Sequence, residues 1–191
     1  MFIPIDNNGF WVNRSVPTPS LEKTAELFNQ MRGETIIEIG SGLHGESSGN
    51  SILIWTQRTR AKRIIAVDTE QERIDEVINA TVQYSNIETV VGDGINYLRD
   101  FQSRIDLLYL DFWVGDAEGV FPGTGRAEAY REAYRAAKDK LSRKSLILID
   151  DTDHVDPWKQ THIVYEARRD GFTVMYVGRQ TLLMRNPSNA I

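Results

Sequence analysis

This chain contains closely spaced glycines and recurring carboxylates, which are residue types that bind ligands and take part in catalysis. Gly40, Gly42 and Gly45 have G-x-G-x-x-G spacing and follow the apolar, β-branched run 35–39. Glycines in such a turn allow positive φ and close approach of a ligand, and the start of a following helix offers unpaired N–H groups to negative charge. The pattern predicts a nucleotide-binding turn, and alone it does not separate dinucleotide oxidoreductases from nucleoside-cofactor transferases.

Carboxylates follow the next four apolar runs that have the length of a buried strand. They are Asp68 after residues 63–67, Asp93 after 87–91, Asp111 after 105–110, and Asp150 with Asp151 after 145–149. An aspartate in that place is often only a turn former or a helix cap. Its recurrence at strand after strand favours one ligand site at the carboxyl ends of a parallel sheet, where such folds bind their ligands.

Two of these aspartates suit the parts of a nucleoside. Asp68 follows the glycine turn by roughly twenty to thirty residues, and its carboxylate can accept two hydrogen bonds from a ribose diol, which NAD and S-adenosylmethionine both carry. Asp93 lies between Gly92 and Gly94, where it could accept a hydrogen bond from an adenine amino group.

Helical patterns alternate with the strand-like runs, and they position these residues. We expect helices over residues 18–33, 51–60, 69–84, 95–101, 126–141 and 156–171, and two last strands over 172–177 and 181–184. Thr69 and Glu72 predict a capping box. The alternation predicts right-handed βαβ units and a doubly wound α/β domain whose last two strands form an antiparallel pair.

Composition narrows the class of partner. A chain of 191 residues with 41% hydrophobic residues suits one domain with a full core. The net charge of -5 argues against binding to nucleic acid or an anionic membrane surface, and the sequence contains no cysteine and no long apolar run. We expect a soluble cytoplasmic protein whose partner is a small molecule.

The chain from about residue 35 to its end resembles the class I S-adenosylmethionine-dependent methyltransferases. The resemblance rests on Glu38-Ile39-Gly40-Ser41-Gly42, on Asp68 and on Gly92-Asp93-Gly94. It implies a Rossmann-like, seven-stranded, mostly parallel sheet with an antiparallel last strand. Residues 35–191 would bind S-adenosylmethionine, with residues 1–34 as an arm and a helix packed on that domain. The cofactor-binding residues that it implies are Glu38, Gly40, Ser41, Gly42, Asp68, Asp93, Gly94 and Asp111.

A narrower resemblance concerns two acidic turns. Leu110-Asp111-Phe112-Trp113 and Ile149-Asp150-Asp151 are similar to the metal-binding turns of divalent-cation-dependent O-methyltransferases, such as catechol O-methyltransferase. It implies that Asp111, Asp150 and Asp151 bind magnesium or another divalent cation, with Asp111 as a catalytic group. A hard cation prefers oxygen ligands and lowers the pKa of a bound hydroxyl. The other interpretation is that Asp150 and Asp151 only cap backbone groups.

The general base is the point at which the chain departs from that family. Val114 stands where the catechol-type enzymes have a lysine. We expect His154, close to the acidic pair in sequence, to take the proton near neutral pH. Lys159 and His44 are weaker alternatives. The acceptor is expected to be a small-molecule hydroxyl, with the arm at residues 2–11 and the loop at 112–125 over its pocket.

Two alternatives to an active methyltransferase stay open. Tyr134 and Lys138 have the Tyr-x-x-x-Lys spacing of short-chain dehydrogenases, although that helix is more simply explained as a packing face. The second alternative is a catalytically silent S-adenosylmethionine-binding module, which Val114 favours. Three clustered carboxylates argue against it, because like charges raise the energy of a site unless a cation or a shared proton compensates. A monomer and a homodimer both stay open.

Overall fold

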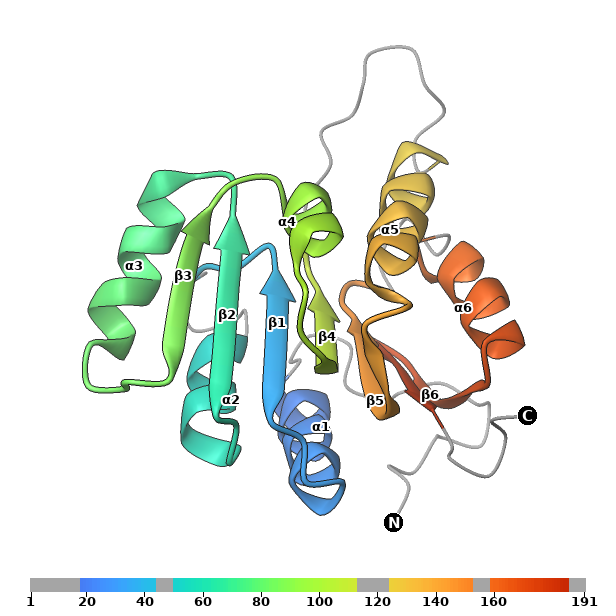
Figure 1. The fold of residues 1–191 in the computed structure, drawn as a ribbon, viewed down its shortest axis with the longest axis horizontal. Helices are drawn as coiled ribbons and strands as arrows, with labels where there is room; N and C mark the ends of the chain where they lie inside the picture. Colours follow the sequence, from blue (N-terminus) through green and yellow to red (C-terminus); the bar gives the residue numbers. More distant parts are fainter. Residues whose placement is uncertain (1–17, 44–49, 113–123, 153–158, 186–191) are drawn as a thin grey trace.

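The computed structural model describes residues 18–43, 50–112, 124–152 and 159–185. Strands and helices alternate along these segments (Figure 1). The elements are α1 (Thr18–Gln30), β1 (Thr35–Ile39), α2 (Ser51–Arg58), β2 (Arg63–Asp68), α3 (Gln71–Thr81), β3 (Ile87–Val91), α4 (Gly94–Asp100), β4 (Ile105–Leu110), α5 (Thr124–Ala137), β5 (Leu141–Ile149), α6 (Lys159–Arg169), β6 (Phe172–Val177) and β7 (Thr181–Arg185).

The seven strands form one sheet in the order β3-β2-β1-β4-β5-β7-β6. β1 pairs in parallel with both β2 and β4, while β7 is antiparallel to its neighbours β5 and β6. The predicted seven-stranded, doubly wound sheet with an antiparallel last strand is therefore confirmed. The strand order reverses between β1 and β4, which places the expected ligand site at their carboxyl ends.

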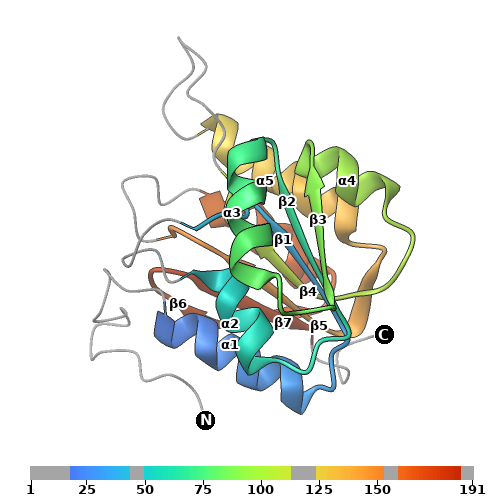
Figure 2. The same cartoon turned by 90° about the vertical axis from the view of Figure 1, so that its left-hand side faces the viewer.

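Helices α1, α2 and α3 cover one face of the sheet, and α4, α5 and α6 cover the other (Figures 1 and 2). Successive side chains of a strand point to opposite faces, so the apolar runs serve two cores at once. The face under α1, α2 and α3 includes Ile36, Ile64, Leu107 and Leu148, and the face under α4, α5 and α6 includes Ile37, Ile65, Leu108 and Ile147.

Helix α1 belongs to the first of these cores. Its residues Leu21, Ala25 and Phe28 are fully buried. The helix ends before Gly33, whose N–H donates to the Phe28 carbonyl at 3.0 Å, as the sequence predicts. The expected arm at residues 1–17 lies outside the described residues, and the division of the chain at residue 34 stays a prediction.

Helix α5 confirms the packing interpretation of the Tyr-x-x-x-Lys pattern. Tyr130, Ala133, Tyr134 and Ala137 are all fully buried in the second core. The Tyr134 hydroxyl donates to Asp170 at 2.5 Å. The chain leaves α5 beside the amino end of β4, opposite to the ligand-binding edge, so Tyr134 does not serve the expected site.

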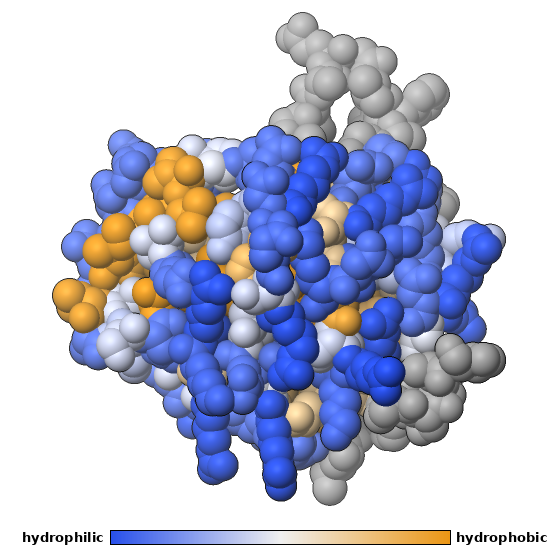
Figure 3. Space-filling view, viewed as in Figure 1, coloured by the Kyte–Doolittle hydropathy of each residue, from blue (hydrophilic) through white to orange (hydrophobic). Residues whose placement is uncertain are grey.

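The face of the molecule seen in Figure 3 is mostly hydrophilic, and its most extensive apolar area lies over α3 and β3 at one edge of the sheet. Ile78, Val82 and Val91 are 44%, 81% and 45% exposed there. Within the part of the chain that the structure describes, no helix is long and apolar enough to cross a membrane.

Candidate active site

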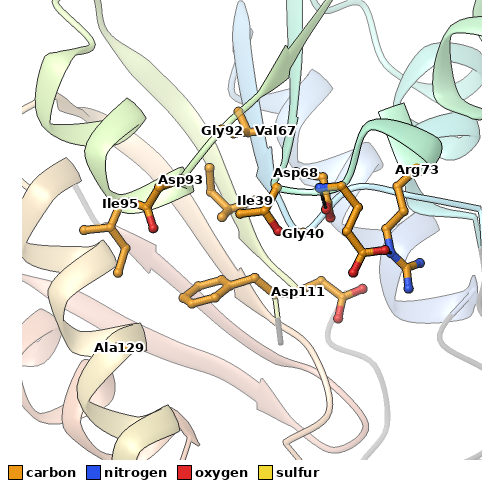
Figure 4. A pocket seen from close by; sticks show the side chains of 14 residues that line it. Ile39, Gly40, Val67, Asp68, Arg73, Gly92, Asp93, Ile95, Asp111 and Ala129 are labelled. Atoms are coloured by element: carbon orange, nitrogen blue, oxygen red, sulfur yellow. Dashed lines mark hydrogen bonds and ion pairs between the residues drawn. The ribbon is translucent and has the colours of Figure 1, made fainter. Parts of the chain in front are cut away.

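A cavity of about 470 Å³ lies where the carboxyl ends of β1, β2, β3 and β4 meet. Each strand contributes to its wall, with Gly40 after β1, Asp68 in β2, Asp93 after β3 and Asp111 after β4. Figure 4 shows Gly40 near the middle of this wall, with Asp93 and Arg73 on opposite sides of it. The residues predicted from separate strand ends are thus brought together.

Gly40 occupies a position that a larger residue could not take. Its φ is +86°, and a Cβ built there would overlap the backbone of Asp111 and Phe112. The Gly40 N–H donates to the Val67 carbonyl at 2.9 Å, and the Asp111 N–H donates to the Ile39 carbonyl at 2.8 Å. The glycine therefore lets the first turn lie directly against the start of the β4 turn.

Glu38 lies beneath the glycine turn and is fully buried. Its carboxylate accepts hydrogen bonds from Ser41 Oγ at 2.9 Å, Ser51 Oγ at 3.0 Å and Trp55 Nε1 at 2.6 Å. Burial raises the Glu38 pKa to about 7, although the three donors oppose that shift. Glu38 thus joins the turn to α2, as expected of a residue that positions the turn.

The cofactor contacts of this turn remain predictions. Among the described residues, the wall of the cavity includes Gly40 but not Glu38, Ser41 or Gly42. Ser41 is fully buried beside Glu38. Roles for these three residues at the methionine part of the cofactor are therefore part of the proposal made below.

Asp68 accepts a hydrogen bond from the Glu70 N–H at 2.9 Å. Burial raises its pKa, while the Glu70 N–H and the Arg73 guanidinium oppose that shift. The predicted Thr69–Glu72 capping box is wrong, because the N-cap of α3 is Glu70, whose side chain makes no capping hydrogen bond. Asp68 instead accepts the N–H of that N-cap residue, and its contact with the ribose stays a prediction.

Asp93 is both a helix cap and a residue of the cavity wall. It is the N-cap of α4, with its Oδ1 accepting from the Asn96 N–H at 2.7 Å, and it also lines the cavity. A Cβ on the neighbouring Gly94 would overlap the Ile39 side chain. The close packing at Gly94 thus fixes Asp93 at the cavity wall, and its contact with adenine stays a prediction.

Asp111, Asp150 and Asp151 form a group of three carboxylates, which we call the acidic cluster. Each offers one carboxylate oxygen, and these three atoms lie within 4.8 Å of one another. Asp150 is only 3% exposed, and its pKa is raised by burial and by the neighbouring Asp151 carboxylate, with Arg179 opposing the shift. The predicted metal ligands are therefore adjacent in space.

A chain of hydrogen bonds orients Asp111, and no pattern in the sequence predicts it. Ser20 Oγ donates to Gln180 Oε1 at 2.5 Å, Gln180 Nε2 lies 3.1 Å from the Tyr109 hydroxyl, and that hydroxyl donates to Asp111 Oδ2 at 3.3 Å. Burial and the nearby carboxylates hold the Tyr109 pKa well above its usual range, so Tyr109 stays a neutral donor. Residues 160 positions apart along the chain thus position one carboxylate.

The structural features of the cavity fit S-adenosylmethionine. Pockets for ligands of this size span roughly 300–1,000 Å³. The Gly40 turn and the carboxylates Asp68, Asp93 and Asp111 all line the cavity, so backbone and acidic acceptors face it from successive strand ends.

The acidic cluster fits a divalent cation. Asp150 Oδ1 is buried and receives no hydrogen bond from the described residues. A divalent cation binds its oxygen ligands at roughly 2.0–2.6 Å, and a cation shared by the three carboxylates would give Asp150 Oδ1 a partner.

The base and the acceptor pocket cannot be placed in the same way. His154, His44 and Val114 lie outside the described residues, as do most of the loop at 112–125 and the arm at 2–11. Lys159 is the first residue of α6, but its side chain is not among those that the structure describes.

Solved structures show the same fold. An O-methyltransferase from Bacillus cereus in complex with S-adenosylhomocysteine has a TM-score of 0.67 at 12% identity, over 91% of this chain and 83% of that one. The O-methyltransferase TomG of Streptomyces achromogenes, involved in tomaymycin synthesis and in complex with S-adenosylmethionine, has a TM-score of 0.65 at 16% identity, over 92% and 83%. A methyltransferase from Geobacter sulfurreducens has a TM-score of 0.63 at 17% identity, over 91% and 82%.

The sheet order and the cavity at its switch point define a class I S-adenosylmethionine-dependent methyltransferase. A family model described as "Methyltransferase domain" matches residues 37–152, which is more than half of the sequence, and the chain belongs to that family. No curated protein matches the sequence. The resemblance inferred from Glu38, Gly40, Asp68 and Asp93 is confirmed, and membership of this family argues against the oxidoreductase alternative.

Proposed function

We propose that this methyltransferase transfers the methyl group of S-adenosylmethionine to a hydroxyl oxygen of a small molecule, with the assistance of a divalent cation. The observation that carries the proposal is the convergence of Asp111, Asp150 and Asp151 within 4.8 Å beside the cofactor cavity. Asp111 is part of the acidic cluster and also lines the cavity. A cation held there would lie next to the transferred methyl group. The names of two structural neighbours, both O-methyltransferases, support the same acceptor class.

The cofactor side would mainly supply positioning. The Gly40 turn with Glu38, Ser41 and Gly42 would hold the methionine part, Asp68 the ribose, and Asp93 with Gly94 the adenine. These assignments place the methyl group toward Asp111, where the two halves of the site meet.

The chemical step is a displacement at the methyl carbon. The acceptor oxygen forms a bond to that carbon while the carbon–sulfur bond breaks, and the electron pair leaves with sulfur. A divalent cation bound at the acidic cluster would lower the pKa of the acceptor hydroxyl. Asp111, Asp150 and Asp151 would hold it, and His154 is the proposed receiver of the hydroxyl proton. The net charge of -5 supports a small molecule rather than a nucleic acid as acceptor.

Calorimetric titration with S-adenosylhomocysteine, in parallel with NADH, tests the cofactor assignment. Binding of the first and not the second is expected, with or without a chelator. Methyl transfer to a panel of catechols and other hydroxyl compounds, followed by mass spectrometry with Mg²⁺ or with chelator, then tests the reaction.

An Asp150→Asn, Asp151→Asn double variant should lose the Mg²⁺-dependent turnover, while Asp139→Asn, which removes an exposed carboxylate elsewhere, should not. Turnover that is equal with Mg²⁺ and with chelator would contradict the role of the cation. Cofactor binding without any turnover across the panel would instead support the silent binding module.

A further inference from the structure

The turn between β6 and β7 is held rigidly against the acidic cluster. The Thr152 N–H donates to the Arg179 carbonyl at 2.9 Å, and Thr152 Oγ1 donates to the Gly178 carbonyl at 2.6 Å. Thr181 Oγ1 lies 3.0 Å from Thr152 Oγ1, and both threonines are buried. The backbone of residue 179 is therefore fixed beside Asp150 and Asp151 by contacts that do not involve the Arg179 side chain.

From this turn the Arg179 side chain reaches two of the three clustered carboxylates. Its Nη2 lies 2.5 Å from Asp151 Oδ1, and its Nε lies 3.6 Å from Asp150 Oδ1. The side chains of Arg179, Asp150 and Asp151 are 23%, 4% and 27% exposed. These pairs are thus largely withdrawn from water, where charges interact more strongly than at an open surface.

Arg179 brings one positive charge to the three carboxylates of the cluster, because a guanidinium stays protonated in proteins. A divalent cation brings two charges and binds oxygen at a shorter distance than the Nε–Oδ1 separation seen here. The cation and Arg179 would therefore compete for the carboxylates of Asp150 and Asp151.

We propose that Arg179 is a built-in counter-ion that competes with the divalent cation for Asp150 and Asp151 and so weakens cation binding. The inference rests on the cation site of the proposed function. Before a cation binds, Arg179 keeps two repelling carboxylates together. When a cation binds, the guanidinium leaves Asp151 and turns outward, while the backbone of its turn stays fixed by Thr152. Arg179 would thereby set the cation concentration at which the site fills.

Titration of the full chain with Mn²⁺, followed by calorimetry, tests this competition. The Arg179→Gln variant is expected to bind Mn²⁺ with a Kd roughly tenfold lower than wild type, because the ion no longer displaces a charge from the cluster. Without metal, the same variant should melt at a lower temperature than wild type, and Mn²⁺ should raise its Tm by a larger amount. Arg143→Gln removes the same charge from an exposed position in β5 and should leave the Kd unchanged.

An Arg179→Gln variant with a Kd equal to or higher than that of wild type would overturn the proposal. If that variant does not fold, Arg179→Lys, which keeps the charge and loses the planar fork, should give a Kd for Mn²⁺ below that of wild type. For Arg179→Lys as well, a Kd for Mn²⁺ at or above the wild-type value would contradict the proposal. If wild type and variants bind S-adenosylhomocysteine but no Mn²⁺, the competition and the cation site both fall, and the cofactor assignment stands.

Discussion

The cofactor cavity and the acidic cluster meet at Asp111, and they are stabilised by contacts of different range. On the cofactor side, Asp68 and Asp93 accept hydrogen bonds from backbone groups two and three residues further along the chain. On the acidic side, Asp150 and Asp151 pair with Arg179, from a turn formed by two later strands. The first half is built locally at each strand end, whereas the second exists only once β7 has joined the sheet.

The two halves of the site therefore differ in what they need before a ligand binds. A carboxylate satisfied by its own turn is ready for a ligand as soon as the strand and helix form. A cluster of carboxylates needs a cation, and the fold supplies one from a distance. Substitutions that act on one half and spare the other are the means to test this division.

Gly40→Ala should have the largest effect, because it acts where the two halves touch. The new Cβ would overlap the Asp111 backbone at a position with φ of +86°. We expect a loss of about 2–4 kcal/mol of unfolding free energy and loss of both S-adenosylhomocysteine and Mn²⁺ binding. Urea denaturation and calorimetry measure both.

Gly92→Ala is the matched control for that variant. A Cβ there meets nothing within 4 Å, so its stability should stay within about 0.5 kcal/mol of wild type. Equal stability losses in the two variants would show that the contact at Gly40 is not what joins the halves.

Glu38→Gln should change how stability depends on pH. The Glu38 pKa is about 7 in the folded chain against an ordinary value of 4.5, so the folded state binds more protons between these values. The wild-type chain should therefore lose stability as pH rises from 4.5 to 7, by roughly 3 kcal/mol from this group, and no further above 7.

The Glu38→Gln chain lacks that contribution, so the difference in stability between the two proteins should itself vary over this range. Urea denaturation at several pH values measures it. A constant difference from pH 4.5 to 8 would show that Glu38 stays ionised under its three donors.

Asp68→Asn should weaken the cofactor side alone. We expect the Kd for S-adenosylhomocysteine to rise roughly tenfold to a hundredfold, because the proposed carboxylate acceptor of the ribose hydroxyls is lost. The Mn²⁺ affinity should stay unchanged. A matching loss of Mn²⁺ affinity would mean that the halves are coupled through more than Asp111.

Tyr109→Phe should have the smallest effect and act on the acidic side. Removing the hydroxyl takes one donor from Asp111 and the partner from Gln180 Nε2, which should cost about 1–2 kcal/mol of unfolding free energy. The Mn²⁺ Kd should rise a fewfold while the S-adenosylhomocysteine Kd stays within a factor of two. A larger effect on the cofactor than on Mn²⁺ would reverse the assignment of Tyr109.

The sequence by itself determined the sheet, the order of its elements and the cofactor edge. Apolar runs of strand length, helical patterns between them and glycine at Gly40 are local signals, and parallel strands bring their carboxyl ends to one edge. That is why Asp68, Asp93 and Asp111 could be expected together before any coordinates. The Thr69–Glu72 capping box failed because α3 begins one residue later, with Glu70 as its N-cap and the Glu70 N–H donating to Asp68, a choice that depends on geometry within the turn.

Only the tertiary structure decided what surrounds the acidic cluster. Arg179 reaches Asp150 and Asp151 because β7 inserts next to β5, and Ser20 contacts Gln180 because α1 packs beneath the same edge. No spacing along the chain encodes these contacts, since they join segments up to 160 residues apart. Their strength depends on burial, which a sequence pattern does not specify, and so the counter-ion of the cluster was visible only in the folded chain.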